Sequence, residues 1–247
     1  RQRQMCIRDR SKSYALEHLL PKQVAEAHLS GDIHFHDLDY HPFQPLTNCC
    51  LIDAKDMLEN GFEIGNAHVT SPKSIQTASA QLVQIIANVS SSQYGGCTVD
   101  RVDELLSTYA QLNAQHHREV AQEFVQPDKL EAYVDKQVTK DIGDAIESLE
   151  YEINTLYTSN GQTPFVTLGF GLGIDGLSRK IQQAILRTRI KGLGKDRMTA
   201  IFPKLVFSIK KGVNFNPTDP NYDIKQLALE CSTKRMYPCL LYTSDAA

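Results

Sequence analysis

The chain has 247 residues, of which 41% are hydrophobic and 22% are charged, so it carries enough apolar sequence to bury a substantial core. Its 26 Lys and Arg residues face 29 Asp and Glu residues, for a formal charge of -3, and no overall basic field favours nucleic acid or a membrane as a partner. No apolar segment approaches the ~20 residues that span a bilayer, and residues 1–10 lack the apolar core of a secretory signal. We therefore expect a cytoplasmic protein.

The first fifth of the chain is predicted to be helical, followed by short strands. Apolar residues at helical spacing over 13–29 indicate a helix or helix pair, with a break at Pro21 and an end at Gly31. Residues 33–36 are β-prone, and 48–53 (NCCLID) form a nearly continuous apolar run. Such a run is typical of a strand covered on both faces, so we expect an interior strand of a sheet or barrel.

Three long helices are predicted next, over 71–96, 100–124 and 127–160. The first is expected to begin with Ser71 as its N-cap, and the last to end at Asn160. The remaining predicted elements are a strand at 163–171, a helix at 176–192, a strand at 203–210 and a helix at 222–236.

Strands separated by helices predict an α/β fold. Only about four strands are visible, whereas a parallel barrel needs roughly twice that number. The sequence therefore indicates either a small sheet or an incomplete chain.

The run GLGIDG at 171–176 satisfies Gly-x-Gly-x-x-Gly between a predicted strand and a predicted helix, which raises a dinucleotide-binding interpretation. Asp196 lies at the spacing of the acidic residue in that fingerprint, but in a loop rather than at the end of a second strand. We therefore interpret these glycines as loop residues. No phosphate-binding Gly-x-x-x-x-Gly-Lys-Ser/Thr motif is present.

A histidine-rich stretch precedes the 48–53 run. His-x-His on a strand places two imidazoles on one face, where they can bind a metal, orient a polar substrate or carry a proton. Structural use in a polar loop is commoner, and we predict no metal site. The residues concerned are His34, His36 and His41, with Asp32, Asp37 and Asp39.

The cysteines are too sparse for a disulfide framework, and the adjacent Cys49 and Cys50 make a poor pair for a strain-free bridge. No Cys-x-x-Cys pair suggests structural zinc. On a strand, Cys49 and Cys50 would point to opposite faces, one toward a cavity and one toward packed helices. Cys97 and Cys231 are assigned to packing. The full set is Cys6, Cys49, Cys50, Cys97, Cys231 and Cys239.

Taken as a set, several segments resemble the catalytic subunits of the anaerobic, class III ribonucleoside-triphosphate reductases, which are glycyl radical enzymes. The resemblance covers residues 11–238 almost without interruption. It is carried by GDIHFHDLDYHPFQPLTNCCLIDAKDMLENGF, SPKSIQTASAQLVQIIANVSSSQYGG, SLEYEINTLYTSNGQTPFVTLGFG, FPKLVFSIKKGVN and KRMYP.

The resemblance implies part of a ten-stranded α/β barrel in which ribonucleoside triphosphates are reduced to deoxyribonucleotides for DNA synthesis. A separate radical-SAM activase with an iron–sulfur cluster generates the glycyl radical, a thiyl radical attacks the ribose, and formate is the reductant. Asn48 and Cys49 match the position of the family's redox cysteine on the first barrel strand, so Cys49 is the expected catalytic residue and Cys50 a packing residue. His34, His36 and Asn48 are expected to bind substrate or formate.

The resemblance also implies an allosteric homodimer. The helices within about 66–160 look like the region where deoxynucleotide or ATP effectors bind between two subunits. Gln84 is the first candidate contact, and Glu150 and Glu152 are weaker ones. The alternative interpretation, that Gln84 is simply a polar residue on a helix and contacts no effector, is about as strong.

Several family features lie outside this sequence. The thiyl cysteine, the radical glycine and the four-cysteine zinc site are expected downstream, and the ATP-binding cone upstream. Residues 1–10 and 239–247 match nothing expected, so both ends are predicted to be foreign sequence. We expect a fragment that is inactive by itself. The alternatives are a glycyl radical acyltransferase of the pyruvate formate-lyase kind and a nucleotide-binding dimerisation module without chemistry.

Overall fold

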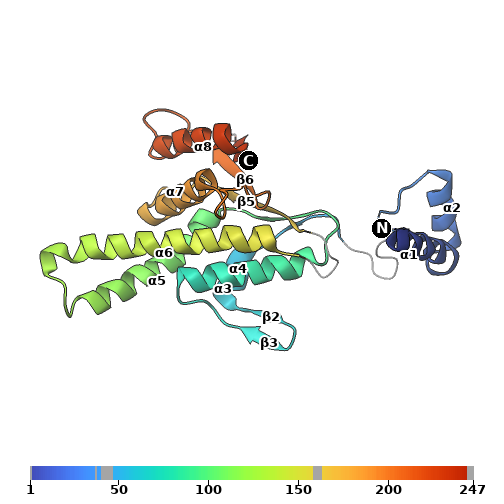
Figure 1. Ribbon diagram of the computed structural model, residues 1–247, viewed down its shortest axis with the longest axis horizontal. Helices are drawn as coiled ribbons and strands as arrows, with labels where there is room; N and C mark the ends of the chain where they lie inside the picture. Colours follow the sequence, from blue (N-terminus) through green and yellow to red (C-terminus); the bar gives the residue numbers. More distant parts are fainter. Residues whose placement is uncertain (1, 37, 40–46, 158–162, 244–247) are drawn as a thin grey trace. The chain divides into compact units, whose positions relative to one another are not determined.

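The computed structural model describes residues 2–36, 38–39, 47–157 and 163–243. These residues fall into two compact units. The smaller unit comprises Arg1–Asn48 and Ser92–Gly95, and the larger one comprises Cys49–Ser91 and Gly96–Ala247. Figure 1 labels the helices and strands of the two units.

The smaller unit is mainly helical, as predicted. It contains α1 (Gln2–Tyr14), a short π-helical segment η1 (Ala15–Leu19) and α2 (Lys22–Ser30). Pro21 separates the last two, and Gly31 ends α2 in the left-handed conformation with φ 88°, which confirms the predicted break and stop. Residues 33–36 form no strand, contrary to their β-propensity. The backbone N–H of Phe35 instead bonds the His28 ring at 3.1 Å, so local contacts with α2 replace strand pairing.

The larger unit is built on a five-stranded parallel sheet in the order β1-β4-β5-β6-β7. Its strands are β1 (Cys50–Leu51), β4 (Gly96–Val99), β5 (Phe165–Phe170), β6 (Lys204–Ile209) and β7 (Cys239–Tyr242). The predicted strands at 163–171 and 203–210 are confirmed. β1, however, is a two-residue strand at the edge of the described sheet, not the interior strand that its apolar run suggested.

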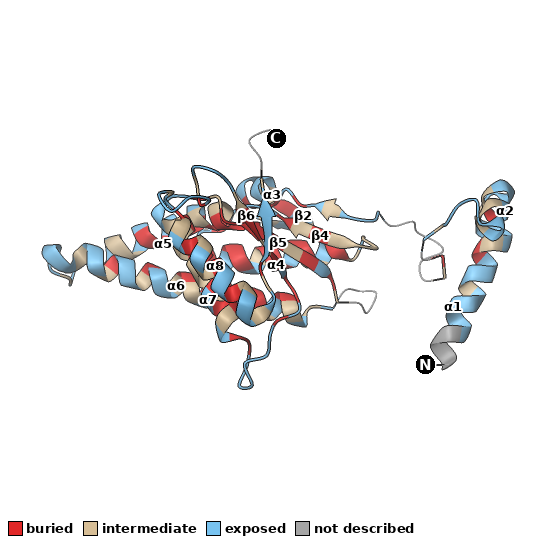
Figure 2. Ribbon diagram, turned by 90° about the horizontal axis from the view of Figure 1, so that it is seen from above, coloured by how far each residue is buried: buried red, intermediate tan, exposed pale blue. Residues whose placement is uncertain are grey.

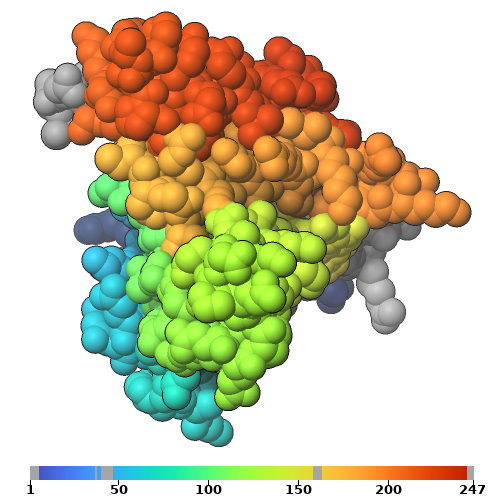
Figure 3. Space-filling view, turned by 90° about the vertical axis from the view of Figure 1, so that its left-hand side faces the viewer, coloured from blue at the N-terminus to red at the C-terminus, as the bar shows by residue number. Residues whose placement is uncertain are grey.

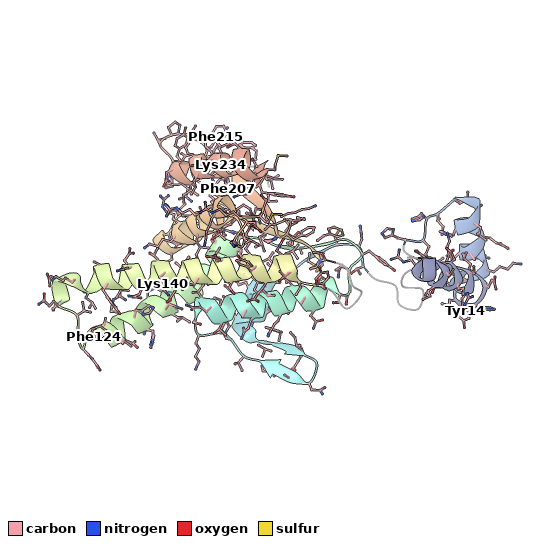
Figure 4. All side chains as sticks on the ribbon, in the orientation of Figure 1. Tyr14, Phe124, Lys140, Phe207, Phe215 and Lys234 are labelled. Carbon is pink, nitrogen blue, oxygen red and sulfur yellow. The ribbon has the colours of Figure 1, made fainter. Side chains whose placement is uncertain are left out.

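The helices of the larger unit are α3 (Ala54–Asn60), α4 (Ile75–Ser90), α5 (Val102–Ala121), α6 (Pro127–Thr155), α7 (Gly176–Lys191) and α8 (Tyr222–Arg235). Between α3 and α4 lies a small antiparallel hairpin of β2 (Phe62–Ile64) and β3 (Ala67–Val69). The tip of the α5–α6 pair is at the front of Figure 3, and Phe124 marks it in Figure 4.

Two helix ends differ from expectation. The N-cap of α4 is Ser74, whose hydroxyl accepts the Thr77 N–H at 3.2 Å; the predicted cap, Ser71, lies three residues too early. α6 ends at Thr155, before the predicted stop at Asn160, which lies outside the described residues. A helix start leaves backbone N–H groups without partners inside the helix, and a serine hydroxyl can accept from one of them. This explains the serine at the N-cap of α4.

One face of the sheet is covered by helices. Alternate strand residues such as Val166, Leu168 and Phe207 are at most 2% exposed, and they share one apolar core with buried residues of α4 to α8 (Figure 2). Each such side chain contributes roughly 1.5–3 kcal/mol through removal of apolar surface from water. On the opposite face, Thr167 and Val206 are only partly buried, whereas Gly169 and Ser208 are buried.

Candidate functional site

The predicted redox cysteine lies at the edge of the sheet. Cys49 is exposed and directly precedes β1, whereas Cys50 is half-buried and packs against the core. Because successive residues of an extended chain point to opposite faces, the Cys49 thiol belongs to the face that the helices leave uncovered. Of the two adjacent thiols, that of Cys49 is therefore the more accessible.

Cys97 and Cys231 are buried, at 1% and 0% exposure. Burial raises the pKa of each thiol to about 11, and the neighbouring Cys50 and Cys49 add to the effect at Cys97. Both thiols are therefore protonated at neutral pH, in line with the packing role predicted for them. Cys6 and Cys239 are exposed.

The proposed substrate residues His34, His36 and Asn48 belong to the smaller unit. The His34 and His36 rings lie 5.9 Å apart, and the His36 ring contacts Tyr94 at 5.2 Å. The segment that carries Tyr94 also meets Asn48, because the Gly95 N–H donates to the Asn48 carbonyl at 2.6 Å. Tyr94 was not predicted. Its hydroxyl is buried and has no hydrogen-bond partner among the described residues, a feature that a local sequence pattern does not reveal.

No group of three His, Cys, Asp or Glu residues suited to a metal ion occurs among the described residues. His41 and Asp37, which belonged to the histidine-rich candidate, lie outside that part of the chain. Asp32 accepts a hydrogen bond from Ser30 at 2.7 Å.

The three candidate effector residues lie in different environments. Gln84 on α4 and Glu152 on α6 are exposed, and Glu152 accepts a hydrogen bond from Ser148 at 2.8 Å. Glu150 is only 5% exposed and forms a buried ion pair with Arg189 of α7. Burial raises the pKa of Glu150, and the Arg189 charge opposes that rise. Glu150 thus already has a partner inside the protein, which favours a structural role for it.

The glycine-rich loop 171–176 surrounds a buried carboxylate. The Gly171 and Gly173 N–H groups each donate to Asp103 at 3.2 Å, and the Gln182 amide donates to the same oxygen. Asp103 is 0% exposed, and burial raises its pKa although these hydrogen bonds oppose the rise. Because an acidic group occupies the loop's N–H donors, a phosphate has no place there, which supports the loop interpretation over dinucleotide binding.

A cavity of about 530 Å³ lies beyond the carboxyl ends of β1 and β4, between α3 and α5. Sequence reasoning did not predict it. Its cations are Lys55 and Arg101, and Arg101 is held by Glu104 through bonds of 2.8 and 2.7 Å. The wall also carries Asp53 and Asp100, so acidic groups outnumber basic ones.

Comparison with known proteins identifies the family. The family model described as anaerobic ribonucleoside-triphosphate reductase matches residues 1–246. The chain therefore belongs to the anaerobic ribonucleoside-triphosphate reductase family. No helix among the described residues is long and apolar enough to cross a membrane.

Particular relatives are similar over nearly the whole chain. The anaerobic ribonucleoside-triphosphate reductases of Haemophilus influenzae and Escherichia coli are each 58% identical over 231 residues, which is 94% of this chain and 32% of each relative. The phage T4 enzyme is 53% identical over 225 residues and is covered to 37% of its length. This chain thus spans about a third of the length of the curated relatives that it matches.

Solved structures support the fold. The Thermotoga maritima anaerobic ribonucleotide reductase in complex with dATP and CTP aligns with a TM-score of 0.60 at 15% identity, over 97% of this chain and 42% of the other. The same enzyme with dATP in its specificity site aligns with a TM-score of 0.58. The predicted α/β class is confirmed, and this chain has the fold of part of those reductases.

Proposed function

We propose that this chain supplies part of the catalytic barrel of an anaerobic ribonucleoside-triphosphate reductase, which converts ribonucleotides to deoxyribonucleotides. The observation that carries the proposal is the family match over residues 1–246. The exposure of Cys49, which directly precedes β1, supports the proposal. The predicted cytoplasmic location stays a prediction.

Cys49 is the proposed redox residue. Removal of a ribose 2'-hydroxyl requires a proton donor and a reducing thiol close to the sugar, in a site that protects radicals from water. Cys49 is exposed and directly precedes β1, and alternation along an extended chain gives it the side opposite Cys50, the side that a closed barrel would turn inward. Cys50 packs against the core on the other face, so it is the less suitable of the two thiols.

The other parts of the chemistry are proposed for regions beyond this chain. They are the glycyl radical made by a radical-SAM activase, the thiyl cysteine, formate as reductant, and zinc. Within this chain, His34, His36 and Asn48 are proposed to contact substrate or formate. Gln84 and Glu152 are the accessible candidates for a deoxynucleotide or ATP effector at a homodimer contact, and Glu150 is the weakest because of its ion pair with Arg189.

The test uses a reductase in which this segment replaces the matching part of the Escherichia coli relative. In that protein Cys49→Ala is expected to abolish deoxynucleotide formation, because the other thiol at β1, that of Cys50, packs against the core. Cys50→Ala is the matched control, and it should retain activity if the protein folds. Undiminished activity of the Cys49→Ala protein, measured anaerobically with formate and activase, would refute the assignment.

A further inference from the structure

Two cysteines are direct neighbours across the first strand pair of the sheet. Cys50 of β1 and Cys97 of β4 are Cα partners in parallel register, and Cys97 is in turn the partner of Val166 on β5. The next row, Leu51 and Thr98, alternates to the opposite face. Cys50 and Cys97 therefore point to the same side of the sheet.

The packing agrees with this register. Cys97 belongs to the buried apolar core, and Cys50 is packed against that same core, while Leu51 is 70% exposed. Both thiols are free in this structure. Cys50 is only half-buried, so one member of the pair can meet a small reagent and the other lies directly behind it.

The backbone spacing is compatible with a covalent bond. Neighbouring strands lie about 4.8 Å apart, and the Cα atoms of a disulfide are usually about 4.4–6.8 Å apart. β1 has two residues and lies at the edge of the described sheet. A two-residue strand with one described neighbour is held by few pairing contacts, so it is the strand of this sheet best able to adjust when the bond closes.

We propose that Cys50 and Cys97 are a reversible oxidation site, in which a small-molecule disulfide of the glutathione class converts the two thiols to a disulfide that joins β1 to β4. This site goes beyond the proposed reductase function and does not depend on it. Cys49 is not consumed, so the bond would fix the strand next to the proposed redox thiol and leave that thiol free.

The reaction balances in two exchanges. The Cys50 thiolate attacks the reagent disulfide, forms a mixed disulfide and releases one reagent thiol. The Cys97 thiolate then attacks the Cys50 sulfur, forms the Cys50–Cys97 bond and releases the second reagent thiol. The protein loses two hydrogens and two electrons, and the reagent gains them. Burial raises the pKa of Cys97 to about 11, so the second exchange is expected to be the slower one.

The experiment is oxidation of the folded 247-residue chain with oxidised glutathione, followed by acid quenching, denaturation, alkylation of free thiols and peptide mass spectrometry. We expect a cross-linked peptide pair that contains Cys50 and Cys97, with Cys231 alkylated. Dithiothreitol should restore both thiols. A mixed disulfide that accumulates on Cys50 while Cys97 stays alkylatable would overturn the proposal.

Variants separate the pair from its neighbour. Cys49→Ser should still form the cross-link, because Cys49 is outside the register pair, and this variant also removes the ambiguity of two adjacent cysteines in one peptide. Cys50→Ser should lose the cross-link completely. Cross-linking that persists in Cys50→Ser and disappears in Cys49→Ser would show that Cys49 is the partner of Cys97, contrary to the proposal.

A folding control keeps the result interpretable. Each variant is compared with the parent chain by circular dichroism and thermal unfolding before oxidation. Since Cys50 is only half-buried, Cys50→Ser is expected to unfold close to the parent temperature. If Cys50→Ser does not fold, Cys50→Ala, which avoids placing a hydroxyl against the core, replaces it with the same expected loss of the cross-link.

Discussion

Arg189 is the largest fully buried charged side chain among the described residues. It is 0% exposed, pairs with Glu150, donates to the Pro203 carbonyl at 2.8 Å and lies 5.5 Å from the Tyr237 ring centroid. It thereby connects α6, α7 and the start of β6. Removing one partner of a buried ion pair leaves an uncompensated charge, whereas removing both can be nearly neutral.

We expect Arg189→Met to lower the free energy of unfolding by about 3–5 kcal/mol. The double variant Arg189→Met/Glu150→Leu should recover part of that loss, because no charge is left buried. The measurement is urea-induced unfolding followed by circular dichroism.

The matched control is Lys191→Met, which breaks the exposed Lys191–Glu147 pair at 2.7 Å and should cost only about 0–1 kcal/mol. A loss in Arg189→Met as small as the control would contradict the importance of the buried pair.

Asp103 provides a prediction about pH. Burial raises the pKa of Asp103 in the folded state above the ordinary value of 3.8, which applies to the unfolded state. Between 3.8 and the raised pKa, the folded state therefore binds more protons than the unfolded state. The contribution of Asp103 to stability therefore falls as pH rises through that window.

As pH rises from about 4, we expect the free energy of unfolding of the parent chain to fall relative to that of Asp103→Asn. Asparagine keeps one oxygen for the loop N–H groups and does not titrate. Chemical unfolding at a series of pH values measures the difference, and a difference independent of pH would show that Asp103 titrates normally.

At the level of elements, helices were predicted better than strands. The predicted helices at 100–124, 176–192 and 222–236 correspond to α5, α7 and α8. For α5 and α7 the reason is that long amphipathic periodicity is a local signal. The strands β4 and β7 were missed. Each has four residues, too few for a periodic pattern to be distinctive, and parallel pairing with distant strands defines them.

The N-cap of α4 is a test at this scale. Ser74→Ala should destabilise the chain by about 1 kcal/mol, because the Thr77 N–H loses its acceptor. Ser74→Asp should keep most of the stability, since a carboxylate can accept the same bond and is favourable at a helix start. The measurement is thermal unfolding of both variants. Equal losses of stability in the two would show that the cap hydrogen bond contributes little.

At the scale of the whole molecule, the exposed residues of α4 and α6 bear on assembly. We expect the chain to dimerise and to be stabilised by deoxynucleoside triphosphates. A ligand at 100 times its Kd raises the free energy of unfolding by about 2.7 kcal/mol. Analytical ultracentrifugation and thermal unfolding with each of the four deoxynucleotides are the measurements.

Gln84→Ala should reduce the thermal shift. The control, Gln115→Ala, removes an exposed glutamine of α5 that bonds only Glu119 among the described contacts, and it should leave the shift unchanged. A monomer that responds to none of the nucleotides would contradict both the effector and the dimer predictions.

The sequence by itself determined the family, the α/β class and the positions of the long helices, because these depend on motifs and on periodicity within a continuous stretch. It also singled out Cys49 through residues adjacent to it. Only the tertiary structure decided the neighbours across the sheet and the burial of single polar groups. Cys50 lies beside Cys97, 47 positions along the chain, and Glu150 pairs with Arg189, 39 positions along. Strand register and helix packing determine these contacts, and no local sequence pattern predicts them.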